Sequence, residues 1–192
     1  GGKSQRIMKA FLRDVLSTFL LAAVVYAGLH YTIQDYVVHQ SSMEPNFQEG
    51  QRVLVTKIVY NFRSPARGDV IILRPPMSSD PKATPFIKRI IALPGESVDI
   101  KDGEVRVNGV KLNEPYIKSP PPYTYSLAKV PENEYFVLGD NRPNSEDSHR
   151  GWTVPRQNII GKAWMSIWPL SKWGLVSNFG LPVQVGKLVG AR

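Results

Sequence analysis

The first 34 residues differ from the rest of the chain in how their hydrophobic residues are spaced. Residues 15–34 contain no Asp, Glu, Lys or Arg, and about 20 such residues in a helix can span the core of a bilayer. The sequence therefore predicts a single transmembrane helix over 15–34. The alternative is a cleavable signal peptide with a short apolar core and a small-residue cleavage site near Ala27. Apolar residues continue as far as Ile33, which a signal peptide does not need, so the span is favoured.

Basic residues lie on one side of this segment only. The residues before it include Lys3, Arg6, Lys9 and Arg13, and no Lys or Arg occurs again until Arg52. Because positively charged flanks stay in the cytoplasm, residues 1–14 are predicted to form a cytoplasmic basic tail. Residues 35–192 would then form an extracytoplasmic domain, attached to the plasma membrane by a single pass.

Beyond residue 34 the hydrophobic residues occur in short β-branched runs bounded by Gly or Pro, which is typical of strands. The pairs Asp102-Gly103 and Asn108-Gly109 supply the positive φ angles of tight hairpins and predict a three-strand meander inside a hairpin insertion at about 98–134. No long helix is expected after residue 34. The pattern predicts a mainly β domain of barrel or sandwich type, with strands near 52–57, 69–73, 86–92, 135–138 and 159–168.

Composition excludes some chemistry and leaves one partner open. The 192 residues contain no cysteine, which excludes disulfides, a thiolate nucleophile and Cys-ligated zinc. The formal net charge is +8, which permits contact with nucleic acid or with anionic lipid. Since no run of five or more basic residues occurs, a surface facing the lipid bilayer is favoured and nucleic acid is not an expected partner.

Ser42 and Lys88 are the candidate nucleophile and base. A serine hydroxyl is a weak nucleophile until a base takes its proton, and a lysine can be that base only where burial lowers its pKa. Ser42 follows the span closely and precedes Pro45, which holds the segment extended or turned. Lys88 lies within an apolar run that includes Phe86 and Ile87. An outward-facing strand lysine is the alternative interpretation of Lys88.

Histidine is the more usual partner of a nucleophilic serine. His149 with Asp147 could build a conventional triad. His39 lies three residues before Ser42, where the alternation of an extended chain points it to the other face. Both remain alternatives to Lys88.

Residues 140–151 bear a superficial likeness to a calcium-binding loop. Arg142 occupies a ligand position there, and Gly151 stands where a bidentate Glu belongs. We therefore expect no metal at this segment.

Four short segments occur in an order that is more specific than any single serine. They are Ser-Met-x-Pro at 42–45 and the segments 52–57, 88–96 and 139–148. Together with the span, they resemble the bacterial type I signal peptidases, the serine/lysine leader peptidases, over most of residues 9–165. The resemblance implies a membrane-anchored serine endopeptidase without a cofactor. Its substrates would be secretory preproteins, whose signal peptides it removes after small residues at the −1 and −3 positions.

The resemblance also implies a role for each matched residue. Neutral Lys88 would take the proton from Ser42 as its oxygen attacks the scissile carbonyl, giving an acyl-enzyme, and would then activate the deacylating water. Ser145 would hydrogen-bond Lys88 and orient it. Asp140 would pair with Arg89, and further expected positions are Asp147 as structural support and Val38, Met43, Phe86 and Ile87 in the substrate pocket.

The sequence departs from the family at the oxyanion hole. Many members have a serine two residues before the nucleophile, and this chain has Gln40. Its side-chain amide could donate to the oxyanion beside the Ser42 backbone N–H. Ser41 is a poorer candidate because alternation points it away.

Two other classes of protein share part of the pattern. A membrane-anchored β-domain that only binds would have a solvated Lys88 and a turn residue at Ser42. A self-cleaving repressor-type Ser/Lys protease would need a DNA-binding domain and no membrane span. The sequence favours the signal peptidase over both.

Overall fold

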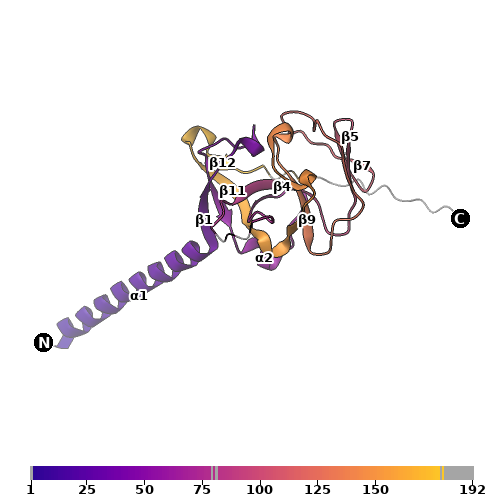
Figure 1. Ribbon diagram of the computed structural model, residues 1–192. Coiled ribbons are helices and arrows are strands. Elements are labelled where there is room, and N and C mark those ends of the chain that lie inside the picture. Colours follow the sequence, from indigo (N-terminus) through magenta and orange to yellow (C-terminus); the bar gives the residue numbers. More distant parts are fainter. Residues whose placement is uncertain (1, 79, 81, 178, 180–192) are drawn as a thin grey trace. The chain divides into compact units, whose positions relative to one another are not determined.

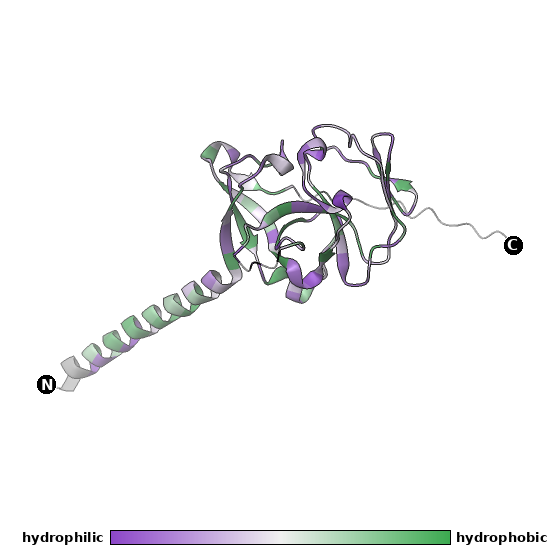
Figure 2. Ribbon diagram, viewed as in Figure 1, coloured by the Kyte–Doolittle hydropathy of each residue, from purple (hydrophilic) through white to green (hydrophobic). Residues whose placement is uncertain are grey.

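The computed structural model describes residues 2–78, 80, 82–177 and 179, and the chain divides into two compact units, residues 1–34 and 35–192. The first unit is dominated by helix α1 (Gly2–Thr32). Its portion Arg6–Thr32 is long and apolar enough to cross a membrane, and hydrophobic residues occupy most of its length (Figure 2). By length and composition, α1 fits a membrane span.

The helix begins and ends earlier than the predicted segment 15–34. Residues 3–13 are mainly helix formers such as Lys, Arg, Met, Leu and Ala, so the helix continues through the basic segment. At the other end, Ile33 and Gln34 already belong to strand β1 (Ile33–Val37). Helicity does not report which side of a membrane a segment occupies, so the cytoplasmic tail stays a prediction.

The second unit is built mainly from two β-sheets (Figure 1). The larger sheet has eight strands in the order β1-β2-β11-β3-β4-β9-β10, with β12 beside β11. Besides β1, these strands are β2 (Arg52–Thr56), β3 (Val70–Leu73), β4 (Phe86–Ala92), β9 (Glu134–Leu138), β10 (Val154–Pro155), β11 (Ile159–Trp168) and β12 (Gly174–Leu175). The smaller sheet has the order β7-β6-β5-β8 and contains β5 (Val98–Lys101), β6 (Glu104–Val107), β7 (Val110–Lys111) and β8 (Tyr125–Leu127). The mainly β prediction is confirmed.

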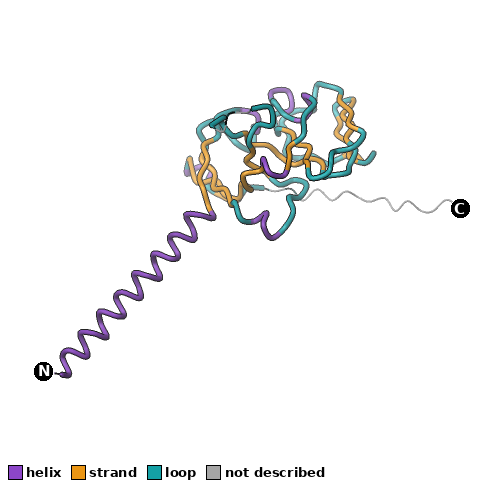
Figure 3. Tube along the Cα trace, turned by 60° about the horizontal axis from the view of Figure 1, so that its bottom comes forward, coloured by secondary structure: helices purple, strands orange, loops and turns teal. Residues whose placement is uncertain are grey.

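Helical segments after residue 34 are short within the described residues (Figure 3). One is a four-residue α-helix and the others are single 3₁₀ turns. They are α2 (Val59–Phe62), η1 (Ser41–Met43), η2 (Arg142–Asn144), η3 (Ser148–Arg150), η4 (Arg156–Asn158) and η5 (Leu170–Lys172).

The predicted meander is present as β5, β6 and β7. Asp102 and Asn108 have φ angles of 53° and 51°, and the glycines that follow them have 76° and 77°. Both central residues of each turn therefore have positive φ, as the tight hairpin requires. Strand β8 was not predicted, because Tyr125 lies just after three prolines in a segment interpreted as a loop.

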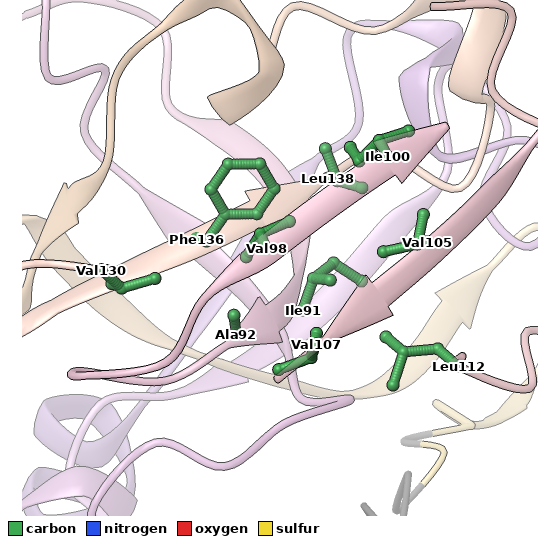
Figure 4. Close-up of a cluster of buried hydrophobic side chains, with 10 residues drawn as sticks. All are labelled: Ile91, Ala92, Val98, Ile100, Val105, Val107, Leu112, Val130, Phe136 and Leu138. Carbon is green, nitrogen blue, oxygen red and sulfur yellow. The ribbon is translucent and has the colours of Figure 1, made fainter. Parts of the chain in front are cut away.

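A buried apolar cluster joins the two sheets. Figure 4 shows side chains from β4, β5, β6 and β9 converging on one another. Burial of each such side chain contributes about 1.5–3 kcal/mol, so the smaller sheet is held firmly against the larger one. The cluster comprises Ile91, Ala92, Val98, Ile100, Val105, Val107, Leu112, Val130, Phe136 and Leu138.

Strand β4 has different neighbours at its two ends. Its pairing with β3 extends from Phe86 to Arg89, whereas its pairing with β9 begins only at Arg89. Among the described residues, β4 is therefore paired only with β3 from Phe86 to Lys88, and the edge that faces β9 further along the strand is unpaired there. Strand β9 ends at Leu138, and the chain that follows it, residues 139–148, brings the fourth matched segment close to this part of β4.

Candidate active site

Ser42 and Lys88 meet in the interior of the second unit. Lys88 Nζ donates a hydrogen bond of 2.7 Å to Ser42 Oγ. Ser42 is only 3% exposed and Lys88 is fully buried. The two residues come from the turn η1 and from strand β4, which are 46 positions apart in the chain. A base within hydrogen-bonding distance can take the serine proton directly.

Burial makes the neutral form of Lys88 accessible. It lowers the pKa of Lys88 from 10.5 to about 8, against the carboxylates of Asp147, Glu146 and Asp140, which act to raise that pKa. The ammonium position also lies 5.1 Å from the centroid of the Phe86 ring. The outward-facing alternative for Lys88 is wrong, because the side chain is completely enclosed.

Arg89, the next residue on β4, forms a buried ion pair with Asp140. Its Nε and Nη2 donate to the two carboxylate oxygens at 2.9 and 2.7 Å. Asn46, just after the turn of Ser42, donates to the same carboxylate at 2.8 Å. Two hydrogen bonds in a fixed fork are the strong form of such a pair, so the pair ties β4, the end of β9 and the Ser42 segment together.

Asp147 fixes the backbone next to the nucleophile. One of its oxygens accepts the Gly139 N–H at 2.9 Å, and the other lies 2.7 Å from His149 Nδ1. A Cβ added at Gly139 would overlap both the Ser145 hydroxyl and the carbonyl oxygen of Ser42. Gly139 is therefore required for the close approach of the two segments.

The Asp147–His149 pair of the alternative triad exists, but within the described residues His149 makes no hydrogen bond to Ser42. The base in contact with Ser42 Oγ is Lys88. The geometry favours the lysine over the histidine.

The expected hydrogen bond from Ser145 to Lys88 is not formed. Ser145 is buried, yet its Oγ has no hydrogen-bond partner in the described part of the chain. The residue is extended after the turn η2, with φ −140° and ψ 128°, and its side chain packs against Gly139. Ser145 thus lies beside the site without orienting the lysine in this structure.

An open cavity of about 650 Å³ borders Ser42. Its walls are residues 39–42, 142–146 and 149–150 together with Glu49 and Tyr123. Gln40 is exposed on this wall, and its side chain makes no hydrogen bond to any described residue. The Ser42 backbone N–H likewise donates no hydrogen bond within the described ranges, which leaves it available to an oxyanion.

His39 and Ser41 do not point away from Ser42 as strand alternation predicted. Both residues line the same cavity as Ser42. The reason is that residues 41–43 form a 3₁₀ turn instead of a continuing strand, so successive side chains do not alternate between two faces. The Ser41 hydroxyl accepts a hydrogen bond of 2.8 Å from Asn144.

The four predicted pocket residues do not form one group. Val38, Met43 and Ile87 belong to a single buried apolar cluster. Phe86 instead packs against a different cluster, which includes Tyr60 and Ile90. Alternation along β4 explains the difference, since Phe86 and Ile87 point to opposite faces of the strand.

Several residues that shape the site had no role in it assigned from the sequence. Asn141 holds the nucleophile turn by donating its backbone N–H to Ser42 O at 2.9 Å and its side-chain amide to Ser41 O at 3.0 Å. Arg142 is fully buried and forms a bidentate ion pair with Glu114. A buried arginine requires a carboxylate, but spacing alone could not identify one 28 residues away.

Comparison with known proteins identifies the family of this chain. The family described as "Signal peptidase, peptidase S26" matches residues 11–168. The chain belongs to this family. It is 40% identical over 164 residues to the "Probable signal peptidase I-2" of Synechocystis sp., covering 84% of this chain and 75% of that protein.

A second relative agrees with this membership. The "Signal peptidase I" of Leptolyngbya laminosa is 41% identical over 168 residues, covering 85% of this chain and 83% of that protein. A crystal structure of a signal peptidase I from Enterococcus faecalis V583 has 32% sequence identity and a TM-score of 0.46, covering 52% of this chain and 97% of that one. As a member of peptidase family S26, the chain is a serine endopeptidase.

Proposed function

We propose that this chain is a membrane-anchored endopeptidase that removes signal peptides from secreted preproteins, with Ser42 as nucleophile and Lys88 as base. The observation that carries the proposal is the 2.7 Å hydrogen bond between two buried side chains, Lys88 Nζ and Ser42 Oγ, in a member of the signal peptidase family.

In the acylation step, the neutral amine of Lys88 takes the Ser42 hydroxyl proton as Oγ bonds to the carbonyl carbon of the scissile peptide. The resulting ammonium gives this proton to the departing amine nitrogen when the C–N bond breaks. The products of the step are an ester between the signal peptide and Ser42, and the free amino terminus of the mature protein.

In the deacylation step, Lys88 is neutral again and takes a proton from a water molecule. The hydroxide oxygen attacks the ester carbonyl, and the C–O bond to Ser42 breaks with return of the proton to Oγ. The signal peptide leaves as a carboxylic acid, which ionises and releases its proton to the solvent. The developing oxyanion in both steps would accept a hydrogen bond from the Ser42 backbone N–H, with the Gln40 side-chain amide as the second donor.

Small residues before the cleavage point would be recognised by the apolar surface near Ser42. Val38, Met43 and Ile87, which belong to one buried cluster, would contribute to this surface. Phe86, which lies beside Lys88 on the face of β4 opposite Ile87, would also contribute. Apolar pockets of limited depth accept a methyl group and exclude larger side chains.

Attachment to the membrane would occur through the predicted span at 15–34. The basic tail at 1–14 would remain in the cytoplasm, and the catalytic domain at 35–192, with its insertion at about 98–134, would lie outside. This arrangement would hold the site at the surface where the cleavage point of a translocated preprotein emerges. Charge asymmetry and the candidate span support it.

The test uses the purified full chain in detergent micelles with a preprotein that carries an Ala-x-Ala site. We expect one cut after this site, identified by sequencing the new amino terminus. Ser42→Ala and Lys88→Ala should each lower kcat/KM by a factor of about 10² to 10⁴.

Ser126→Ala and Lys101→Ala are matched controls, because they make the same substitutions at exposed positions of the smaller sheet. They should retain wild-type activity. Full activity of either active-site variant would disprove the assigned roles, and failure to cut any preprotein would disprove the function itself.

A further inference from the structure

The cavity beside Ser42 differs in character from a pocket for small apolar residues. None of Val38, Met43, Phe86 and Ile87 lines it. Its volume of about 650 Å³ is far larger than an alanine side chain requires. Under the proposed function, the small residues before the cleavage point would bind elsewhere, which leaves the cavity available to another part of the substrate.

The mouth of the cavity carries charges that the protein itself does not neutralise. Glu49, Glu146 and Arg150 are exposed lining residues. Their side chains form no ion pair or hydrogen bond with any residue that the structure describes. By contrast, Arg142 in the same wall is neutralised by Glu114.

Negative charge is in excess at the mouth of the cavity. Two free carboxylates oppose one free guanidinium, and the buried carboxylate of Asp147 lies directly behind His149, another lining residue. The other ionisable groups facing the cavity are His39 and Tyr123, whose ring stacks on His149 at 4.0 Å between centroids. An acidic mouth on a chain of net charge +8 is a local feature and does not follow from the overall composition.

We propose that this cavity receives the first residues of the mature protein, on the leaving-group side of the scissile bond, and that Glu49 and Glu146 favour basic side chains there. The inference rests on the proposed function. Ser42 borders the cavity, so a substrate bound with its small residues on the apolar side of Ser42 would continue into the cavity after the cleavage point. Basic side chains would find two carboxylates without partners.

The experiment compares peptide substrates with an identical Ala-x-Ala site and with Lys, Gln or Glu at the first three mature positions. For the wild-type chain, kcat/KM should be about 2- to 5-fold higher with Lys than with Glu, the size expected of exposed charge pairs. The ratio should fall towards one near 1 M salt, where the screening length is only about 3 Å.

The double variant Glu49→Gln/Glu146→Gln should abolish this preference or reverse it, because Arg150 remains. Arg150→Gln should enlarge it. Glu132→Gln is the matched control, since Glu132 is 75% exposed, pairs with Lys129 and lies outside the cavity; its ratio should equal that of the wild type. Using a ratio cancels any general effect of Glu146 on Lys88.

A Lys/Glu ratio of one in the wild type, or an unchanged ratio in the double variant, would overturn the inference. So would a larger effect when the charge is placed at the −2 position. If the Gln substrate is cleaved normally in these cases, the proposed function stands. Absence of cleavage of the Gln substrate would overturn the proposed function and this inference with it.

Discussion

Raising the pH from 7 to 9 should increase kcat/KM about tenfold. The reaction requires neutral Lys88, whose pKa is lowered by burial to about 8. At that pKa roughly a tenth of the lysine is neutral at pH 7 and roughly nine tenths at pH 9. A solvated lysine with a pKa of about 10.4 would be neutral in less than about 0.1% of molecules at pH 7. Burial therefore makes catalysis near neutral pH practicable.

The assay is cleavage of a fluorogenic Ala-x-Ala peptide by the full chain in micelles, from pH 6 to 10 at constant ionic strength. The acid limb of kcat/KM reports the pKa of the free enzyme's essential base. Ser42→Ala supplies the background rate. His149→Asn, whatever its effect on the height of the profile, should leave the acid limb near pH 8.

A midpoint near 6.5, the ordinary pKa of histidine, would contradict the lysine mechanism if His149→Asn abolished it. A midpoint above 10 would show that burial does not lower the lysine pKa.

The lowered pKa of Lys88 also affects the stability of the fold. Since the unfolded chain holds the proton more tightly between about pH 8 and 10.5, stability should rise by about 3 kcal/mol through that window from this group.

Three substitutions test the surroundings of the dyad. Asp140→Asn should lower the free energy of unfolding by about 3–5 kcal/mol in urea titrations, because it leaves Arg89 buried beside a neutral amide; the exposed Glu132→Gln should change it by less than about 0.5 kcal/mol. Gly139→Ala should lower kcat/KM by about 10², since displacement of the Ser42 segment misplaces the nucleophile. Gly161→Ala, whose Cβ would overlap Thr56 backbone away from the site, should destabilise the fold without this loss. Gln40→Ala should lower kcat by about 10²–10³ if the amide donates to the oxyanion, with KM unchanged.

Each of these three predictions would be contradicted by a specific result. Unfolding energies of Asp140→Asn within error of the wild type would show that the buried ion pair contributes little. Equal activity losses at Gly139 and Gly161 would reduce the first effect to general overpacking. Wild-type kcat in Gln40→Ala would leave the Ser42 N–H as the sole donor of the two.

The strands could be predicted where a run of apolar residues was bounded by residues typical of turns. The bounds of β4 and β11 match the predicted runs 86–92 and 159–168, because both segments are rich in apolar residues and each ends shortly before a proline, Pro94 or Pro169. Strand β8 has three residues after a proline run, and its pairing with β5 is a tertiary contact that local propensity does not contain.

Parts of the site depend on the folded geometry, which a short segment of sequence does not encode. The turn at Ser41–Met43 overrides strand alternation and brings Ser41 into the cavity. Ser145 was expected to hydrogen-bond Lys88, but its side chain lies against Gly139, which itself approaches the Ser42 carbonyl. This contact joins segments that are far apart in the chain. The ion pair between Arg142 and Glu114 is likewise fixed by folding and not by spacing.

The absence of cysteine from the 192 residues permits a direct test of Lys88 as the base. Lys88→Cys would carry a unique thiol, and alkylation of the unfolded protein with 2-bromoethylamine followed by refolding would restore an amine at nearly the original position. We expect Lys88→Cys to lose a factor of about 10²–10⁴ in kcat/KM, aminoethylation to recover most of it, and alkylation with iodoacetamide to recover none. Full activity of untreated Lys88→Cys, or equal activity after both reagents, would contradict the Ser42–Lys88 mechanism.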